Sequence, residues 1–408
     1  MSELQRSFAR AHLSRLPPEA PAISDVPTAL EGESLDACPP SPEDSSSSAS
    51  SASSVGTIVP SPSRNLFERP RGTAAGSRNG PLPWNDFFSE ELFFEQKTPS
   101  ETIVHHAYLT PPSSSGPLIV THHGAGSSGL SFAIFTAEFL KLVPEAGVLS
   151  LDARGHGQTT TTASSGDSPP TQDLSLTTLA EDLAFVVNGA KAKMKWANLP
   201  DIVLIGHSLG GAVVTEVAHQ KLLGRSLLAY GVLDVVEGSA MDALRSMDTY
   251  LSTRPKSFPS LASGIEWHVK SRTIRNTTSA RVSVPSLLQE SETHDKWSWR
   301  TDLASTKPFW EGWFNGLSKK FLESQGGKLL LLAGTDRLDK ELMIGQMQGK
   351  YQLQVFPDAG HFIQEDQPAK TAQVVADFYK RNDRSALVLP PKVDDLIRQG
   401  KLKPAGHK

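Results

Sequence analysis

The chain of 408 residues contains a single cysteine, Cys38. One cysteine excludes an internal disulfide and any metal site built from several thiolates, and it fits a reducing compartment. Lys and Arg total 40 against 44 Asp and Glu, so the net charge of −4 provides no broad positive surface for nucleic acid. No apolar run approaches the roughly 20 residues that span a membrane, and the N-terminus lacks the apolar core of a secretory signal. We therefore expect a soluble, intracellular protein of the cytoplasm or nucleus that binds neither nucleic acid nor membrane.

Hydrophobic residues are also scarce for a globular chain, at 38%. The shortage is greatest in residues 1–80, where prolines recur and residues 45–54 are only serine and alanine. Such a segment buries too little apolar surface to offset the entropy lost on ordering, so we predict a disordered tail over 1–80. A folded domain over 81–382 and a loose, mildly basic tail over 383–408 complete the predicted organisation. We expect four aromatic residues just beyond the first tail to pack on the domain: Phe87, Phe88, Phe93 and Phe94.

Short apolar runs alternate with helical patterns through the rest of the chain. The runs predict strands over 103–109, 117–122, 147–152, 227–236, 328–333 and 351–356, with helices over 132–142, 174–194 and 367–381. This alternation predicts an α/β fold with a mostly parallel sheet covered by helices on both faces. The alternation lapses over 238–321, a segment that holds five of the 7 tryptophans and is predicted to form a helical cap over a cleft. Ligands bind beyond the carboxyl ends of the strands in such sheets, so catalytic residues are expected at these ends.

One strand end carries a nucleophile motif. An apolar run from Ile202 ends in Gly206-His207-Ser208-Leu209-Gly210, and a helical pattern follows. This strand–turn–helix context is typical of a nucleophile elbow, in which a tight turn lifts the serine hydroxyl towards a cleft. Glycines at both ends of the motif leave room where side chains would collide, and the backbone N–H of Leu209 would face an oxyanion formed on a carbonyl attacked by Ser208. The alternative is a glycine-rich turn with an incidental serine.

A serine nucleophile needs a base and a second oxyanion donor. His361 follows the last predicted strand, where this kind of fold places its base. The loop that begins at His123 is rich in small residues, and the N–H of Ala125, with Gly124 as its neighbour, is our candidate for the second donor. No carboxylate stands at ligand spacing beside the histidines of this loop, so we predict no metal. Acyl transfer by a serine requires no organic cofactor either.

The acid that orients the histidine has two candidates. Asp336 follows the penultimate strand, the usual place, and Asp234 follows the strand before it among apolar neighbours, where an unpaired carboxylate would be costly to bury. Geometry alone allows either. Arg154, at another strand end, is a candidate to bind a peptide carboxylate or carbonyl, with a structural ion pair as the alternative. The cap residues Trp310 and Trp313 either line a binding surface for an apolar side chain or form a small core.

Several stretches beyond the serine motif match the pattern of one family: Pro83-Trp84, Leu233-Asp234-Val235-Val236-Glu237-Gly238, Arg254-Pro255-Lys256-Ser257-Phe258, Ile265-Glu266-Trp267, Ile274-Arg275-Asn276, Trp310-Glu311-Gly312-Trp313-Phe314 and Leu332-Ala333-Gly334-Thr335-Asp336. On these stretches the chain resembles the protein phosphatase methylesterases, a branch of the α/β hydrolases, over about residues 80–382. The family usually has methionine after the nucleophile, where this chain has Leu209.

The resemblance implies a specific reaction. Enzymes of this family hydrolyse the methyl ester on the C-terminal leucine of the protein phosphatase 2A catalytic subunit and release methanol, without a cofactor. The resemblance also places the acid after the earlier strand, which favours a triad of Ser208, Asp234 and His361 with Asp336 as the alternative acid. Two other functions stay open: an esterase of small molecules or lipids, and a non-catalytic module that binds the phosphatase.

Overall fold

The structure is a computed structural model that describes residues 80–163, 172–334, 338–384 and 398. All of these residues belong to one compact unit. The predicted tails over 1–80 and 383–408 lie outside the described residues, apart from a few positions at their edges.

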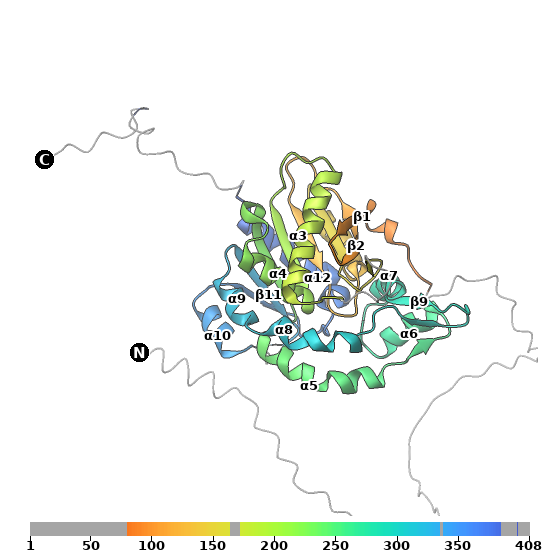
Figure 1. Cartoon of the computed structure of the whole chain (residues 1–408). Helices are drawn as coiled ribbons and strands as arrows, with labels where there is room; N and C mark the ends of the chain where they lie inside the picture. Colours follow the sequence, from red (N-terminus) through yellow and green to blue (C-terminus); the bar gives the residue numbers. More distant parts are fainter. Residues whose placement is uncertain (1–79, 164–171, 335–337, 385–397, 399–408) are drawn as a thin grey trace, which may run out of the picture. The chain divides into compact units, whose positions relative to one another are not determined.

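A mixed, nine-stranded sheet forms the centre of the domain (Figure 1). Its strands are β1 (Glu90–Lys97), β2 (Glu101–Thr110), β3 (Leu118–His122), β4 (Gly147–Asp152), β5 (Thr160–Ala163), β6 (Ile202–His207), β7 (Leu227–Leu233), β11 (Gly327–Leu332) and β12 (Gln352–Val355). The order is β1-β2-β4-β3-β6-β7-β11-β12, with β5 paired to β2. Neighbours from β4 to β12 run parallel, whereas β1 and β5 pair antiparallel with β2, and β2 with β4. The predicted, mostly parallel sheet is confirmed.

Helices cover both faces of this sheet because its central strands are apolar on both sides. In β6, Ile202 and Leu204 pack into one hydrophobic core with α3 (Leu176–Lys193) and α4 (Leu209–Gln220). Val203 and Ile205 point to the opposite core, with α2 (Ala133–Leu142) and α12 (Pro368–Asn382). The remaining elements of the main domain are short: η1 (Trp84–Asp86), η2 (Gly129–Phe132), η3 (Gly224–Ser226), α10 (Lys340–Met347) and α11 (Ile363–Asp366).

The segment between β7 and β11 forms the predicted cap, but the cap is not wholly helical. Its elements are α5 (Glu237–Thr253), β8 (Ser257–Phe258), α6 (Leu261–Lys270), α7 (Thr277–Leu287), β9 (Leu288–Glu290), β10 (Trp297–Trp299), η4 (Ala304–Phe309), α8 (Trp310–Phe314) and α9 (Leu317–Glu323). β10 pairs antiparallel with β8 and β9 in a separate three-stranded sheet. Strands of two or three residues are too short to show an alternating pattern, which is why the sequence predicted only helices here.

The four phenylalanines near the start of the domain do not all pack inward. Phe88 and Phe94 are buried, but Phe93 is 46% exposed. Strand β1 explains the difference, because successive side chains of a strand point to opposite faces and Phe94 takes the inner one. Phe93 still contacts the domain, because its ring centre lies 4.8 Å from that of the buried His106, but it is only partly covered.

Candidate active site

Ser208 lies in a tight turn between β6 and α4. Its backbone has φ of +52° and ψ of −119°, a strained conformation for a residue with a side chain. The N–H of Ser208 donates to the carbonyl of Leu233 at 3.0 Å, which ties the turn to the end of β7. The turn therefore has the geometry expected of a nucleophile elbow.

The two glycines of the motif are required by close backbone contacts. A Cβ atom at Gly206 would lie 2.0 Å from the carbonyl oxygen of Gly210, inside the turn itself. A Cβ atom at Gly210 would lie 2.1 Å from the carbonyl oxygen of His122, on the neighbouring strand β3. Since no side chain fits at either position, Gly-x-Ser-x-Gly is the sequence that lets this turn form.

His361 and Asp234 are paired. The Nδ1–H of His361 donates to Oδ2 of Asp234 at 2.8 Å. The carboxylate is fully buried, whereas the His361 side chain is 46% exposed. A histidine that donates from Nδ1 to a carboxylate leaves Nε2 without a proton in its neutral form, ready to accept one.

Asp234 reaches this position from an unusual backbone conformation. Its φ is +51°, in the left-handed region, at the point where the chain leaves β7 for the cap. Its N–H donates to the carbonyl of Leu331 at 2.8 Å, and its Oδ1 accepts the N–H of Ala333 at 2.9 Å. The carboxylate therefore lies at the end of β11, the strand after which such folds usually carry the acid. The alternative candidate, Asp336, lies outside the described residues.

Ser208 and His361 line the same cavity, but they are not hydrogen-bonded to each other. Within the described part of the chain, the Ser208 hydroxyl makes no hydrogen bond at all. A loose serine–histidine contact is common in free enzymes and tightens when the substrate binds.

The loop after β3 contacts the elbow. A Cβ atom at Gly124 would lie 3.1 Å from Cβ of Ser208, and both Gly124 and Ala125 line the cavity. Leu209 is the first residue of α4, where backbone N–H groups have no partner inside the helix. The structure thus places Gly124 and Ala125 at the cavity beside Ser208, and Leu209 directly follows the serine in the chain.

Two buried histidines hold this loop in place. Nε2 of His123 accepts the N–H of Ala153, and Nε2 of His156 accepts the N–H of Gly126, both at 2.9 Å. Each ring donates from Nδ1 to a backbone carbonyl, of Gly124 and Arg154 respectively. Burial lowers the pKa of both histidines, so both rings are neutral acceptors at neutral pH.

His207, the second residue of the motif, ties the serine turn to the histidine loop. Its Nε2–H donates to the carbonyl of His361 at 2.8 Å. Burial, with the charge of His361 as a smaller cause, lowers the pKa of His207 to about 3. The sequence reasoning missed this contact, because the motif leaves that position open and only the fold brings His361 beside it.

The cavity above these groups has a volume of about 680 Å³ and is mainly apolar. Its walls combine the elbow, the oxyanion loop and Phe362 beside His361 with residues of the cap. The larger cap residues are Leu244, Met247, Tyr250, Arg254, Trp267, Trp299 and Phe314. This volume is ordinary for a site that binds a small molecule or a short peptide segment.

The arrangement is that of a serine hydrolase, and comparison with known proteins agrees. The model of the alpha/beta hydrolase family matches residues 119–374. A protein phosphatase methylesterase 1 of Aspergillus oryzae is 63% identical over 421 residues, which cover 99% of this chain and 95% of that protein. The protein of that name in Neurospora crassa is 56% identical, with 98% and 100% covered, and the one in Schizosaccharomyces pombe is 46% identical, with 76% and 87% covered. The chain belongs to the protein phosphatase methylesterase family.

Both the predicted family and the predicted α/β hydrolase fold are thereby confirmed, and the chain is an esterase of this family. Among solved structures, E-2-(acetamidomethylene)succinate hydrolase superposes with a TM-score of 0.53 at 17% identity, covering 71% of this chain and all of that chain. At this identity the similarity shows the fold alone.

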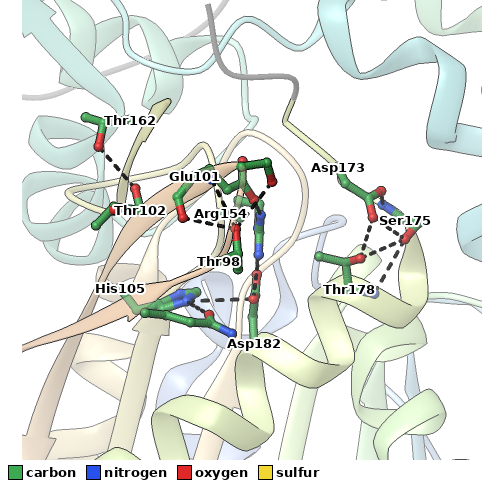
Figure 2. A network of polar contacts seen from close by, with 12 residues as sticks. Thr98, Glu101, Thr102, His105, Arg154, Thr162, Asp173, Ser175, Thr178 and Asp182 are labelled. Atoms are coloured by element: carbon green, nitrogen blue, oxygen red, sulfur yellow. Dashed lines mark hydrogen bonds and ion pairs between the residues drawn. The ribbon is translucent and has the colours of Figure 1, made fainter. Parts of the chain in front are cut away.

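In this family member, Arg154 does not reach the cavity. Its guanidinium forms a bidentate ion pair with Asp182 on α3, at 2.9 and 2.8 Å, and a further ion pair with Glu101 (Figure 2). Nε2 of His105 lies 3.7 Å from Oδ1 of Asp182, an oxygen that also accepts a hydrogen bond from Arg154. The structure therefore places Arg154 in the alternative role given above, a buried ion pair, because β2 and α3 bring carboxylates to it from distant parts of the sequence.

Trp310 and Trp313 also lie away from the cavity. The Nε1–H of Trp310 donates to Oγ1 of Thr306, and that of Trp313 donates to the carbonyl of Leu174, both at 2.7 Å. Both rings are buried in the core beside α3 and α4. The tryptophans that line the cavity are instead Trp267 and Trp299, which the sequence placed in the cap without distinguishing them from the others.

Neither a metal cluster nor a membrane helix is found in the parts of the chain that the structure describes. There, no three His, Cys, Asp or Glu side chains are grouped as metal ligands. Each described helix is too short or too polar to cross a lipid bilayer.

Proposed function

We propose that this chain hydrolyses the methyl ester on the C-terminal leucine of the protein phosphatase 2A catalytic subunit, with Ser208 as nucleophile. The observation that carries the proposal is the His361–Asp234 pair, whose atoms lie 2.8 Å apart in the cavity that Ser208 also lines. The printed names of relatives up to 63% identical supply the substrate class, a protein phosphatase that carries a methyl ester.

The first half of the reaction forms an acyl-enzyme. Nε2 of His361 accepts the proton of the Ser208 hydroxyl while Oγ attacks the ester carbonyl carbon, and the carbonyl oxygen becomes an oxyanion. The N–H groups of Leu209 and Ala125 donate to this oxyanion. The buried carboxylate of Asp234 stabilises the imidazolium that has formed. The C–O bond to the methoxy group then breaks, His361 returns its proton to the leaving oxygen, and methanol departs.

The second half regenerates the enzyme. His361 takes a proton from a water molecule, whose oxygen attacks the acyl carbon and forms a second oxyanion in the same donor pair. The bond to Ser208 Oγ breaks, the proton returns to the serine, and the leucine carboxylate is released. The ester and one water are consumed, and one carboxylic acid and one methanol are produced.

The cavity explains why the leucine, and not the leaving group, must carry the specificity. A methoxy group is small and offers few contacts, whereas a leucine side chain gains from burial among apolar neighbours. Met247, Trp267 and Trp299 present such a surface on the cap side of the cavity.

The direct test is incubation of the full chain with the methylated phosphatase, followed by detection of the free C-terminal carboxylate. We expect wild-type protein to demethylate the phosphatase and Ser208→Ala to lose activity by at least about 10⁴-fold, because the covalent step needs the hydroxyl. The variant should still bind the phosphatase. A matched control is Ser252→Ala, an exposed serine at the end of α5.

Three results would contradict the proposal. Full demethylation by Ser208→Ala would exclude the serine mechanism. Rapid cleavage of simple esters without demethylation would favour an esterase of small molecules or lipids. Binding of the phosphatase without any ester cleavage would favour a non-catalytic binding module.

A further inference from the structure

The cavity around Ser208 carries a single cationic side chain. Among the described residues that line it, Arg254 is the only lysine or arginine. Arg254 directly follows α5, in the cap, and its guanidinium carbon lies 3.6 Å from the centre of the Trp299 ring. A guanidinium over an indole face is favourable, and it leaves the N–H groups at the edge of the fork free to point outward.

The Trp299 ring that supports Arg254 is itself held in position. Its Nε1–H donates to the carbonyl of Pro255 at 2.7 Å. The rings of Phe258 and Trp267 pack against it edge to face, with centres 5.5 and 6.0 Å away. The guanidinium therefore rests on a fixed surface, which lowers the entropy lost when it binds a ligand.

No protein group described in the structure neutralises this charge. The guanidinium of Arg254 makes no hydrogen bond and no ion pair within the described part of the chain. The two carboxylates in the cavity lining are engaged elsewhere: Asp234 with His361, and the largely exposed Asp242 with Arg245 at 3.1 Å. Burial lowers the pKa of Arg254, and the interaction with Tyr250, which raises it, offsets only part of this effect.

The histidine whose pKa responds to the charge of Arg254 is neutral. His268 lines the cavity, and burial, with the charge of Arg254 as a smaller cause, lowers its pKa to about 4. Its Nδ1–H donates to the carbonyl of Gly264 at 2.8 Å. The cavity thus presents one guanidinium with open donors in a mainly apolar surrounding.

We propose that Arg254 is a specificity-determining residue that binds an anionic group, a carboxylate or a phosphate, of the substrate chain upstream of the methylated leucine. This inference rests on the proposed function. A fork of N–H donors matches the oxygens of either anion, and a pair formed in a largely apolar cavity is stronger than one on the surface. A leucine methyl ester alone does not fill about 680 Å³, so residues that precede it reach the cap wall.

The test uses the full chain and peptides that end in leucine methyl ester. Each of the positions before the leucine carries in turn Glu, Gln, phosphoserine or Ser, and kcat/KM is measured for each peptide. At one position we expect wild-type protein to cleave the Glu or phosphoserine peptide about tenfold to a hundredfold faster than its neutral counterpart, the usual effect of one charged hydrogen-bonded pair. Whichever anion gives the larger ratio identifies the source of the charge.

The variant Arg254→Met should remove this preference, so that charged and neutral peptides are cleaved at rates within about twofold of each other, since it deletes the charge and keeps an apolar stem. Arg254→Lys should retain part of the preference. The matched control is Arg245→Met on α5, the helix that Arg254 directly follows, because the side chain of Arg245 is 81% exposed and lies outside the cavity lining. Turnover of a simple acetate ester shows that each variant is folded.

The outcomes separate the two proposals. If wild-type protein cleaves the acetate ester but none of the leucine methyl esters, the proposed function fails. If it cleaves charged and neutral peptides equally at every position, the role of Arg254 is wrong and the function stands. Retention of the preference in Arg254→Met, or an equal loss of rate on all peptides, would also overturn that role. The ratio of kcat/KM between charged and neutral peptides is measured on wild-type protein alone, so this part of the test does not depend on whether Arg254→Met folds.

Discussion

Replacement of Glu365 by glutamine should make the protein more stable at alkaline pH. Glu365 lies on α11, four residues after His361, and is 1% exposed. Its Oε2 accepts the hydroxyl of Ser283, on α7 of the cap, at 2.5 Å. Burial, with the charge of Asp366 as a smaller cause, raises the pKa of Glu365 from 4.5 to about 8. The folded protein therefore holds this carboxyl group protonated at pH 7.

The size of the effect follows from the two pKa values. Below pH 4.5 the carboxyl is protonated in both the folded and the unfolded chain, and its protonation costs nothing. As the pH rises towards 8, the unfolded chain gives up the proton and the folded chain keeps it, so the free energy of unfolding falls by about 1.4 kcal/mol per pH unit. Between pH 5 and pH 8 the loss is about 3 kcal/mol. Glutamine has nearly the same shape and does not titrate.

The assay is the melting temperature of wild-type protein and Glu365→Gln at pH 5 and pH 8. For a domain of this size, 1 kcal/mol corresponds to about 2 °C. The melting temperature of the variant minus that of wild type should therefore be about 6 °C larger at pH 8 than at pH 5. Other titrating groups are common to both proteins and cancel in the difference. The exposed Glu341→Gln serves as control and should show no such gain. An equal difference in melting temperature at both pH values would refute a carboxyl kept protonated by burial.

Three further predictions concern the site. Asp234→Asn should lower kcat by about 10³-fold or more, whereas Asp336→Asn should change it little, and steady-state kinetics that gave the reverse order would move the acid to Asp336. Asp366 accepts the N–H of Gly360, next to the histidine, at 2.6 Å, so Asp366→Asn should lower kcat by about tenfold and leave KM within twofold. If kcat and KM changed by the same factor, the hydrogen bond between Gly360 and Asp366 would not position His361. His207 has a pKa of about 3 against 6.5 when unfolded, so it should cost about 1.4 kcal/mol of stability per pH unit as the pH falls below 6.5, and a flat acid denaturation profile would contradict this.

Local patterns were enough to predict the tight turn at Ser208 and to select the histidine that pairs with Asp234. The strand, turn and helix around Ser208 are consecutive in sequence, and the two glycines are fixed by contacts within the turn and with one neighbouring strand. His361 could be predicted from its position after the last strand of an alternating series. Both predictions needed only the order of the elements along the chain.

Predictions that depended on side-chain direction failed or stayed open. Arg154 stands at a strand end, as a substrate-binding residue would, but Asp182 and Glu101 meet it there through the packing of α3 and β2. Composition showed that the cap is rich in tryptophan, but not that Trp310 and Trp313 face the core of the main domain. The direction in which such a side chain points depends on contacts between residues far apart in sequence, which periodicity does not reveal.

The bond between Asp234 and the end of β11 has a consequence for how such sites change in evolution. Asp234, the first residue after β7, places its carboxylate beside the N–H of Ala333, the first residue after β11. A carboxylate at either strand end is therefore within reach of the same point. An ancestor with a carboxylate at both strand ends could therefore lose either one and keep a working acid, without any change in the position of the histidine. The sequence position of the acid then differs between lineages, whereas the place of its oxygens beside the histidine is set by the reaction.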